Sequence, residues 1–167
     1  MNKRNIILIG MPGAGKSSVG VILAKVLGYE FIDTDLVIQH REKRLLREII
    51  ADEGNEGFLA IENEVNATLE ADKSVIAPGG SAIYGKEAME HFKEIGTIVY
   101  LKLSYEDLAK RLGNLKGRGV VLKEGQTLKD LYDERSKLYE QYAEITVDES
   151  GRDIQGTILA FREQIGM

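Results

Sequence analysis

The chain has 167 residues, a length typical of one domain whose core is large enough to be stable without covalent cross-links. It contains no cysteine, which excludes disulfides and thiolate metal sites and agrees with a reducing compartment. The net charge of −5 argues against nucleic acid as the main partner, because binding to phosphate backbones requires a local or overall basic excess.

Short apolar segments alternate with longer amphipathic ones along the sequence. In chain order the pattern predicts strands over 5–10, 30–32, 74–77, 97–103 and 145–147. It predicts helices over 17–27, 36–51, 57–71, 85–94, 105–112, 127–142 and 154–165. Alternation of buried strands with helices is typical of a single α/β domain, here 1–167, with a parallel sheet covered on both faces. Ligands of such sheets bind beyond the carboxyl ends of the strands.

Two of the predicted helices carry further signals. Gly28 is expected to end the first helix as its C-cap. In the helix predicted over 57–71, Phe58, Ile61, Val65 and Leu69 are spaced to share one side.

No apolar segment is long enough for a membrane span or for the core of a secretion signal. The apolar residues 6–9 stop at a glycine-rich turn, and no run of about 18 apolar residues occurs. We therefore expect a cytoplasmic protein that does not associate with membranes.

A phosphate-binding pattern, G-x-x-x-x-G-K-[ST], is matched at every fixed position by residues 10–17. The motif follows a predicted strand and opens a predicted helix, so that its backbone N–H groups and the helix N-terminus can surround phosphate oxygens. Lys16 supplies a positive charge to the β- and γ-phosphates, and the Ser17 hydroxyl is placed to bind Mg²⁺. The predicted nucleotide-binding residues of this motif are Gly13, Ala14, Gly15, Lys16, Ser17 and Ser18.

Two carboxylates, Asp33 and Asp35, follow the second predicted strand and should face the same crevice as the phosphate motif. Either could simply cap the helix that begins near Leu36. The favoured interpretation assigns one acid to magnesium and the other to an acceptor hydroxyl. An aspartate with a pKa of about 3.9 cannot deprotonate an alcohol in the ground state, but phosphoryl transfer is loose, so the acid orients the hydroxyl and accepts its proton late.

With these motifs in place, the sequence resembles the shikimate kinases over nearly its full length. The resemblance is carried by the phosphate motif, by Asp33-Thr34-Asp35, by Gly79-Gly80, and by arginines at 111, 118 and 135. It implies the P-loop kinase fold, with a five-stranded parallel sheet, helices on both faces and a mobile lid at about 113–126. It also implies ATP and Mg²⁺ as cofactors and a small hydroxy acid, shikimate, as the acceptor that becomes 3-phosphoshikimate. We expect a monomer.

The resemblance also implies roles for single residues. On the nucleotide side, Asp33 would hold magnesium through water together with Ser17, Arg111 would stack on adenine and Arg152 would border it. Arg118 would cover the phosphates when the lid closes, and the glycine-rich, cationic composition of 113–125 independently favours a lid there.

On the acceptor side, Asp35 would hold the reacting hydroxyl and Arg135 the carboxylate; as a lone arginine, Arg135 could equally be the exposed side of an amphipathic helix. The resemblance gives Lys16, Asp35 and Arg118 as the catalytic residues. The expected acceptor-binding residues are Asp35, Gly79, Gly80, Ser81 and Arg135.

The sequence departs from the family pattern on the acceptor side. Leu59 stands where the family has an arginine that contributes to holding the carboxylate, and Glu62 remains without that neighbour. Ser81 replaces a third glycine. Loss of one charge-assisted hydrogen bond to the carboxylate weakens shikimate binding by about 10- to 100-fold unless another basic side chain, such as Arg47, compensates.

Other functions remain open at this stage. A kinase for another polyol or a sugar acid such as gluconate is one, and a nucleotide-binding module with degraded catalysis is another. A nucleoside monophosphate kinase is disfavoured because its second phosphate needs several arginines, and a switch GTPase is disfavoured because no N-K-x-D motif occurs.

Overall fold

The structure, a computed structural model, describes residues 4–112 and 123–166. One parallel sheet of five strands has the order β2-β3-β1-β4-β5. Its strands are β1 (Asn5–Ile9), β2 (Glu30–Asp33), β3 (Ser74–Ala77), β4 (Gly96–Lys102) and β5 (Ile145–Asp148). The predicted α/β class and the five predicted strands are confirmed.

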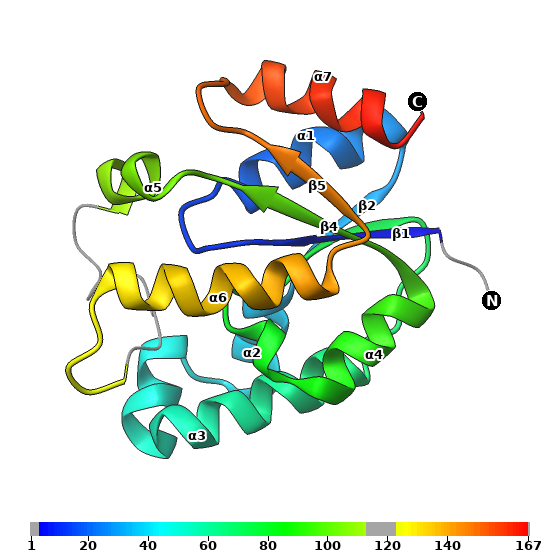
Figure 1. Cartoon of the computed structure of the whole chain (residues 1–167). Helices are drawn as coiled ribbons and strands as arrows, with labels where there is room; N and C mark the ends of the chain where they lie inside the picture. Colours follow the sequence, from blue (N-terminus) through cyan, green and yellow to red (C-terminus); the bar gives the residue numbers. More distant parts are fainter. Residues whose placement is uncertain (1–3, 113–122, 167) are drawn as a thin grey trace.

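Helices cover both faces of the sheet. They are α1 (Lys16–Leu27), α2 (Thr34–Glu42), α3 (Leu46–Ala67), α4 (Lys86–Ile95), α5 (Tyr105–Leu112), α6 (Leu128–Tyr142) and α7 (Ile154–Gln164), with a 3₁₀ turn η1 (Ala82–Tyr84). Figure 1 shows α1 and α7 on one face, and α4 and α6 on the other. Within the described residues, no helix combines the length and the apolar character that crossing a membrane requires.

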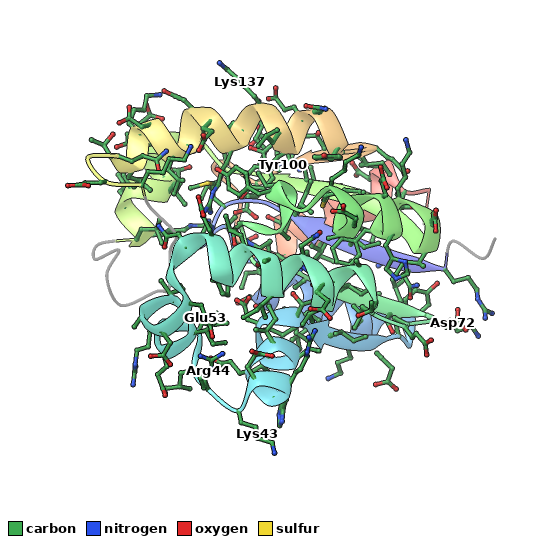
Figure 2. All side chains as sticks on the ribbon, turned by 90° about the horizontal axis from the view of Figure 1, so that it is seen from below. Lys43, Arg44, Glu53, Asp72, Tyr100 and Lys137 are labelled. Atoms are coloured by element: carbon green, nitrogen blue, oxygen red, sulfur yellow. The ribbon has the colours of Figure 1, made fainter. Side chains whose placement is uncertain are left out.

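The side-chain alternation of β1 separates two hydrophobic cores. Leu8 points to the core under α1 and α7, whereas Ile7 and Ile9 point to the core under α4 and α6. In the second core the rings of Tyr100 and Tyr139 pack with centroids 5.1 Å apart, and Figure 2 shows Tyr100 inside the molecule. Because both faces of the sheet are buried, packing holds the carboxyl ends of its strands in fixed positions, where they can support a binding site.

The helix predicted over 36–51 is wrong as a single element. The chain leaves α2 at Lys43, whose left-handed backbone (φ 54°) ends the helix, and α3 starts at Leu46. Arg44, at the outer edge of the molecule in Figure 2, pairs with Glu42 and Glu53 and so ties the turn to α3. Hydrophobic periodicity did not detect this turn, because the residues on either side of it keep a helical spacing.

The second helix of this region begins earlier than predicted and is kinked. α3 continues through Gly54, where the backbone is locally non-helical (φ 75°, ψ 176°), and ends at Ala67 rather than 71. Phe58 and Val65 of the predicted apolar side are buried in a small core between α2 and α3. The predicted C-cap at Gly28 is confirmed, with φ 70° and a backbone N–H bonded to the end of α1.

Most of the predicted lid at about 113–126 lies outside the described residues, and Arg118 lies outside them too. The described part, 123–126, leads into α6, whose N-cap is Thr127.

Candidate active site

The turn between β1 and α1 needs its glycines. Gly13 and Gly15 have φ of 87° and 81°, a region that other residues rarely adopt, and Gly15 is the N-cap of α1. A Cβ on Gly13 would lie 2.8 Å from Cδ2 of Leu112. The turn therefore curls tightly against α5, with its backbone exposed toward the carboxyl end of the sheet.

Lys16 closes this turn from inside. Its Nζ donates hydrogen bonds to the carbonyls of Gly10 (2.7 Å) and Met11 (2.9 Å). The N–H of Ala14 donates to the Met11 carbonyl at 3.0 Å, so this amide forms a hydrogen bond within the turn. Burial lowers the pKa of Lys16 to about 8, against the opposing charge of Asp35, so the ammonium is mostly charged at pH 7. Phosphate oxygens are stronger acceptors than carbonyls and can draw Nζ from the turn.

The two aspartates have different surroundings. Asp33 ends β2, and its Oδ1 accepts a hydrogen bond from the Asp35 N–H at 2.9 Å, so the capping interpretation is correct for Asp33. Asp35 lies in the first turn of α2. Burial, followed by the charge of Asp33, raises the pKa of Asp35 to about 6, although Lys16 lowers it. Asp35 is therefore a better proton acceptor than an ordinary aspartate and is still mostly ionised at pH 7.

These groups share one cavity of about 490 Å³ at the carboxyl ends of β1, β2 and β3. The turn and α1 form one wall of the cavity, Asp33 at the end of β2 and Asp35 in α2 form a second, and α3 forms a third. The segment after β3 forms the floor, and α6 contributes Arg135. The lining residues are Pro12, Gly13, Gly15, Lys16, Ser17, Ser18, Asp33, Asp35, Leu46, Phe58, Glu62, Ala77, Pro78, Gly79, Gly80, Ser81 and Arg135.

The glycines after β3 keep the acceptor half of the cavity open. A Cβ on Gly79 would lie 2.8 Å from Oδ1 of Asp35 and 3.0 Å from Oε2 of Glu62. A Cβ on Gly80 would lie 3.0 Å from Nη1 of Arg135. A side chain at Gly79 would crowd the two acids, and a side chain at Gly80 would crowd Pro12 and Arg135.

Arg135 is a buried part of this site, with 1% of its surface exposed, so the exposed-face alternative is wrong. Its guanidinium lies over the ring of Tyr84, 5.5 Å from the centroid. The Tyr84 hydroxyl donates to Glu134 at 2.7 Å, and the Tyr139 hydroxyl donates to the Gly80 carbonyl at 2.6 Å. The sequence interpretation missed these supporting tyrosines, because single tyrosines on amphipathic segments carry no signal of what they bond.

The described residues fit a magnesium ion that is held mainly by phosphates. They contain no group of three or more His, Cys, Asp or Glu side chains arranged to hold a metal. Ser17 and Asp33 do line the cavity together. One hydroxyl and one carboxylate suit Mg²⁺, which keeps several waters and usually takes one or two protein oxygens plus substrate phosphates.

Comparison with known proteins decides the family. A family model described as shikimate kinase matches residues 12–165. The chain belongs to the shikimate kinase family. Shikimate kinase 2 of Yersinia enterocolitica is 34% identical over 154 residues, which cover 87% of this chain and 86% of that protein.

Solved shikimate kinases have the same fold. The enzyme from Acinetobacter baumannii in complex with shikimate is 34% identical, with a TM-score of 0.81, covering 95% of this chain and 89% of that one. The enzyme from Aquifex aeolicus is 28% identical, also with a TM-score of 0.81, covering 97% and 96%. The chain is accordingly an ATP-dependent small-molecule kinase with the P-loop fold of this family.

The structure shows where the residues lie at which the acceptor side is expected to depart from the family pattern. Leu59 is half-buried, packs in the core between α2 and α3, and does not line the cavity. Arg47 is exposed and does not line it either, so the structure gives no support to compensation by Arg47. Ser81 is buried and donates a hydrogen bond from Oγ to Oε1 of Glu62 at 2.7 Å. The cavity thus contains a buried Ser81–Glu62 hydrogen bond. The sequence indicated the two residues separately and did not predict the bond between them.

Two further predicted nucleotide residues that the structure describes, Arg111 and Arg152, do not line the cavity. Arg111 on α5 donates from Nη1 to the Gly13 carbonyl at 3.3 Å and pairs with Glu149 at 3.1 Å. Burial raises the pKa of Glu149 to about 7 even though Arg111 opposes this. Arg152 is exposed, and its backbone N–H donates to the Glu149 carbonyl at 3.0 Å. The Arg111 guanidinium therefore lies against the phosphate turn, and Glu149 contacts both Arg111 and the backbone of Arg152.

Proposed function

We propose that the protein transfers the terminal phosphate of ATP to one hydroxyl group of shikimate, giving 3-phosphoshikimate. The observation that carries this proposal is the shared cavity, in which the phosphate turn with Lys16 faces Asp35 across the space beside Gly79 and Gly80. An alcohol held by Asp35 would thus lie next to the terminal phosphate. The relative from Acinetobacter baumannii, solved in complex with shikimate, supports the choice of acceptor.

The nucleotide half of the cavity would hold the polyphosphate. Backbone N–H groups of the turn and the N-terminus of α1 bind the phosphate oxygens, and Lys16 moves from the turn carbonyls to the β- and γ-phosphates. Ser17 would bind Mg²⁺ directly and Asp33 through water. A magnesium ion held there would neutralise charge that develops on the phosphates during transfer.

The acceptor half would orient the alcohol. Asp35 accepts a hydrogen bond from the reacting hydroxyl, whose oxygen forms the new bond to the γ-phosphorus as the bond to the β–γ bridging oxygen breaks and ADP leaves. The hydroxyl proton passes to Asp35 late in this step, which its raised pKa of about 6 favours. Arg135, buried under α6 and fixed over Tyr84, binds the carboxylate.

Three arginines complete the proposed site. Arg118 would neutralise the transferring phosphate, and it remains our candidate from the sequence. Arg111 would stack on adenine, and Arg152 would border the base. The contact of Arg111 with the Gly13 carbonyl supports its assignment, because it places the guanidinium beside the phosphate turn.

We further propose a monomeric, cytoplasmic enzyme in which 1–167 form one domain and which binds neither nucleic acid nor membranes. The lack of cysteine supports a reducing compartment such as the cytoplasm, and the net charge of −5 argues against nucleic acid as a partner.

A sugar-acid kinase is the second candidate. Among the described residues that line the cavity, Lys16 and Arg135 are the only basic ones, and they face Asp33, Asp35 and Glu62. This balance favours an acceptor with several hydroxyl groups and a single carboxylate, which gluconate also provides. A degraded nucleotide-binding module is disfavoured, because the lysine and the acid needed for transfer line the same cavity.

The test is ADP release from ATP and Mg²⁺ with shikimate, quinate, gluconate and simple polyols as acceptors. We expect shikimate to give the highest kcat/KM. The control pair is Lys16→Met, which should abolish turnover, and Lys25→Met on the exposed side of α1, which should not change it. Turnover with gluconate but not with shikimate would reject shikimate as the acceptor, and no stimulation by any acceptor would favour the binding module.

A further inference from the structure

One carboxylate oxygen of Glu62 is buried beside the acceptor half of the cavity and has no hydrogen bond to any other described residue. The side chain, on α3, is 1% exposed. Its Oε1 accepts the bond from Ser81 Oγ, whereas Oε2 is buried with no partner among the described residues. Oε2 lies 3.0 Å from the point where a Gly79 Cβ would stand, and Asp35 Oδ1 lies 2.8 Å from that same point. This unpartnered oxygen of Glu62 and the acid assigned to the reacting hydroxyl, Asp35, therefore border the same small space.

The charged groups around Glu62 come from three other elements: Asp35 on α2, Arg135 on α6 and Lys16 on α1. Burial is the main cause that raises the pKa of Glu62, to about 7, and the charge of Asp35 adds to it. The hydrogen bond from Ser81 lowers the pKa, as do Arg135 and Lys16. Near neutral pH, Glu62 therefore exists in both protonation states.

The two states act on an acceptor in opposite ways. An ionised Glu62 has no proton to donate and repels the carboxylate of a hydroxy acid. A protonated Glu62 places its O–H on Oε2, because Oε1 already accepts from Ser81, and so offers a buried donor to the space beside Gly79. Leu59 supplies no charge or hydrogen bond there, so this donor is available to replace a missing polar contact.

We propose that Glu62, held by Ser81, is a specificity-determining residue. Its protonated carboxyl group donates a hydrogen bond to an oxygen of the bound hydroxy acid, at a position between the hydroxyl held by Asp35 and the carboxylate held by Arg135. The inference rests on the proposed function, since it requires a hydroxy acid in this cavity. It deepens that function by naming the substrate class: a hydroxy acid with a second oxygen close to the reacting hydroxyl.

The direction of the pH dependence follows from this assignment. Because the acceptor binds the protonated form, it raises the pKa of Glu62, and its affinity is complete below the free-enzyme pKa and lost above it. When binding depends on one proton, affinity falls by at most about tenfold per pH unit, and it reaches this slope only above the pKa. We therefore expect affinity to fall by about tenfold in total between pH 7 and pH 8.5.

The experiment is calorimetric titration of shikimate into the enzyme saturated with Mg²⁺ and ADP, from pH 6 to 8.5. The wild type should lose affinity as described. Glu62→Gln keeps an acceptor for Ser81 and a donor toward the cavity, so it should bind as the wild type does at pH 6 and show no loss up to pH 8.5. Glu64→Gln, an exposed change on the same helix, is the control and should follow the wild type.

Ser81→Ala tests the pair rather than the residue alone. Removing the bond that stabilises ionised Glu62 should move the midpoint of the affinity loss to higher pH, which a purely structural role for Ser81 would not do. The proposal is overturned if wild-type affinity is constant from pH 6.5 to 8.5, if Glu62→Gln loses affinity in parallel with the wild type, or if the Ser81→Ala midpoint does not rise.

The proposed function fails separately. If the wild type binds ADP but no shikimate at pH 6, shikimate is rejected as the acceptor. The same pH series with the hydroxy acid that supports ADP release then decides the role of Glu62 by the same criteria.

Discussion

Replacing Gly79 by alanine puts a methyl group into the space where the reacting hydroxyl should lie. The new Cβ would stand 2.8 Å from Asp35 Oδ1 and 3.0 Å from Glu62 Oε2, both shorter than an ordinary carbon–oxygen contact. Relief requires a displacement of about half an ångström or more, chiefly of the Asp35 carboxylate. Because a misplacement of about 1 Å can cost about 100-fold in rate, we expect kcat/KM for the acceptor to fall by about 10- to 100-fold.

Coupled measurement of ADP release gives kcat/KM for Gly79→Ala, and equilibrium titration with ATP and Mg²⁺ gives its nucleotide affinity. Nucleotide affinity should stay within about twofold of wild type, because the phosphate turn is on another wall. Glu90→Ala, an exposed change on α4 away from the cavity, is the control and should keep wild-type kinetics. A Gly79→Ala enzyme with kcat/KM within about threefold of wild type would refute the placement of the acceptor beside Gly79.

Further predictions concern the acid, the altered acceptor side and the floor of the cavity. Asp35→Asn should lower kcat by about 100-fold or more with unchanged ATP affinity, and retained transfer would remove Asp35 from this role. Wild-type kcat should fall as the pH drops through about 6, because protonated Asp35 cannot accept the proton of the hydroxyl group. Leu59→Arg should lower the KM for shikimate by about tenfold in steady-state assays, and an unchanged or higher KM would show that the site binds the carboxylate differently. Tyr139→Phe should reduce the free energy of unfolding in urea by about 1–3 kcal/mol, because the buried Gly80 carbonyl loses its donor; a loss below about 0.5 kcal/mol would contradict this.

The sequence was sufficient for the sheet because its signals there are local. The β1–α1 turn must be built from glycines to curl, and the apolar strands between helical segments leave a parallel sheet as the arrangement that buries them. Strand ends in such a sheet meet at one edge, which is why Asp33 and Asp35 could be expected to face the phosphate turn.

The errors and omissions depend on contacts between distant residues. The break at Lys43 rests on one left-handed residue, and the kink of α3 rests on Gly54; neither disturbs the hydrophobic spacing around it. The burial of Arg135 depends on how α6 packs over Tyr84, 51 positions earlier in the chain, and the state of Glu62 depends on Ser81. A sequence pattern carries no measure of such burial, so the chemistry of the acceptor side required the structure.

The central claim is that phosphate passes from ATP to an alcohol aligned by Asp35. Its most direct test is ³¹P and ¹H NMR of the products formed by the wild type from ATP, Mg²⁺ and shikimate. We predict a single phosphate monoester on one shikimate hydroxyl, formed in equal amount with ADP. Release of inorganic phosphate with ADP and no ester would contradict the account, because it would mean that water, and not a bound alcohol, reaches the terminal phosphate.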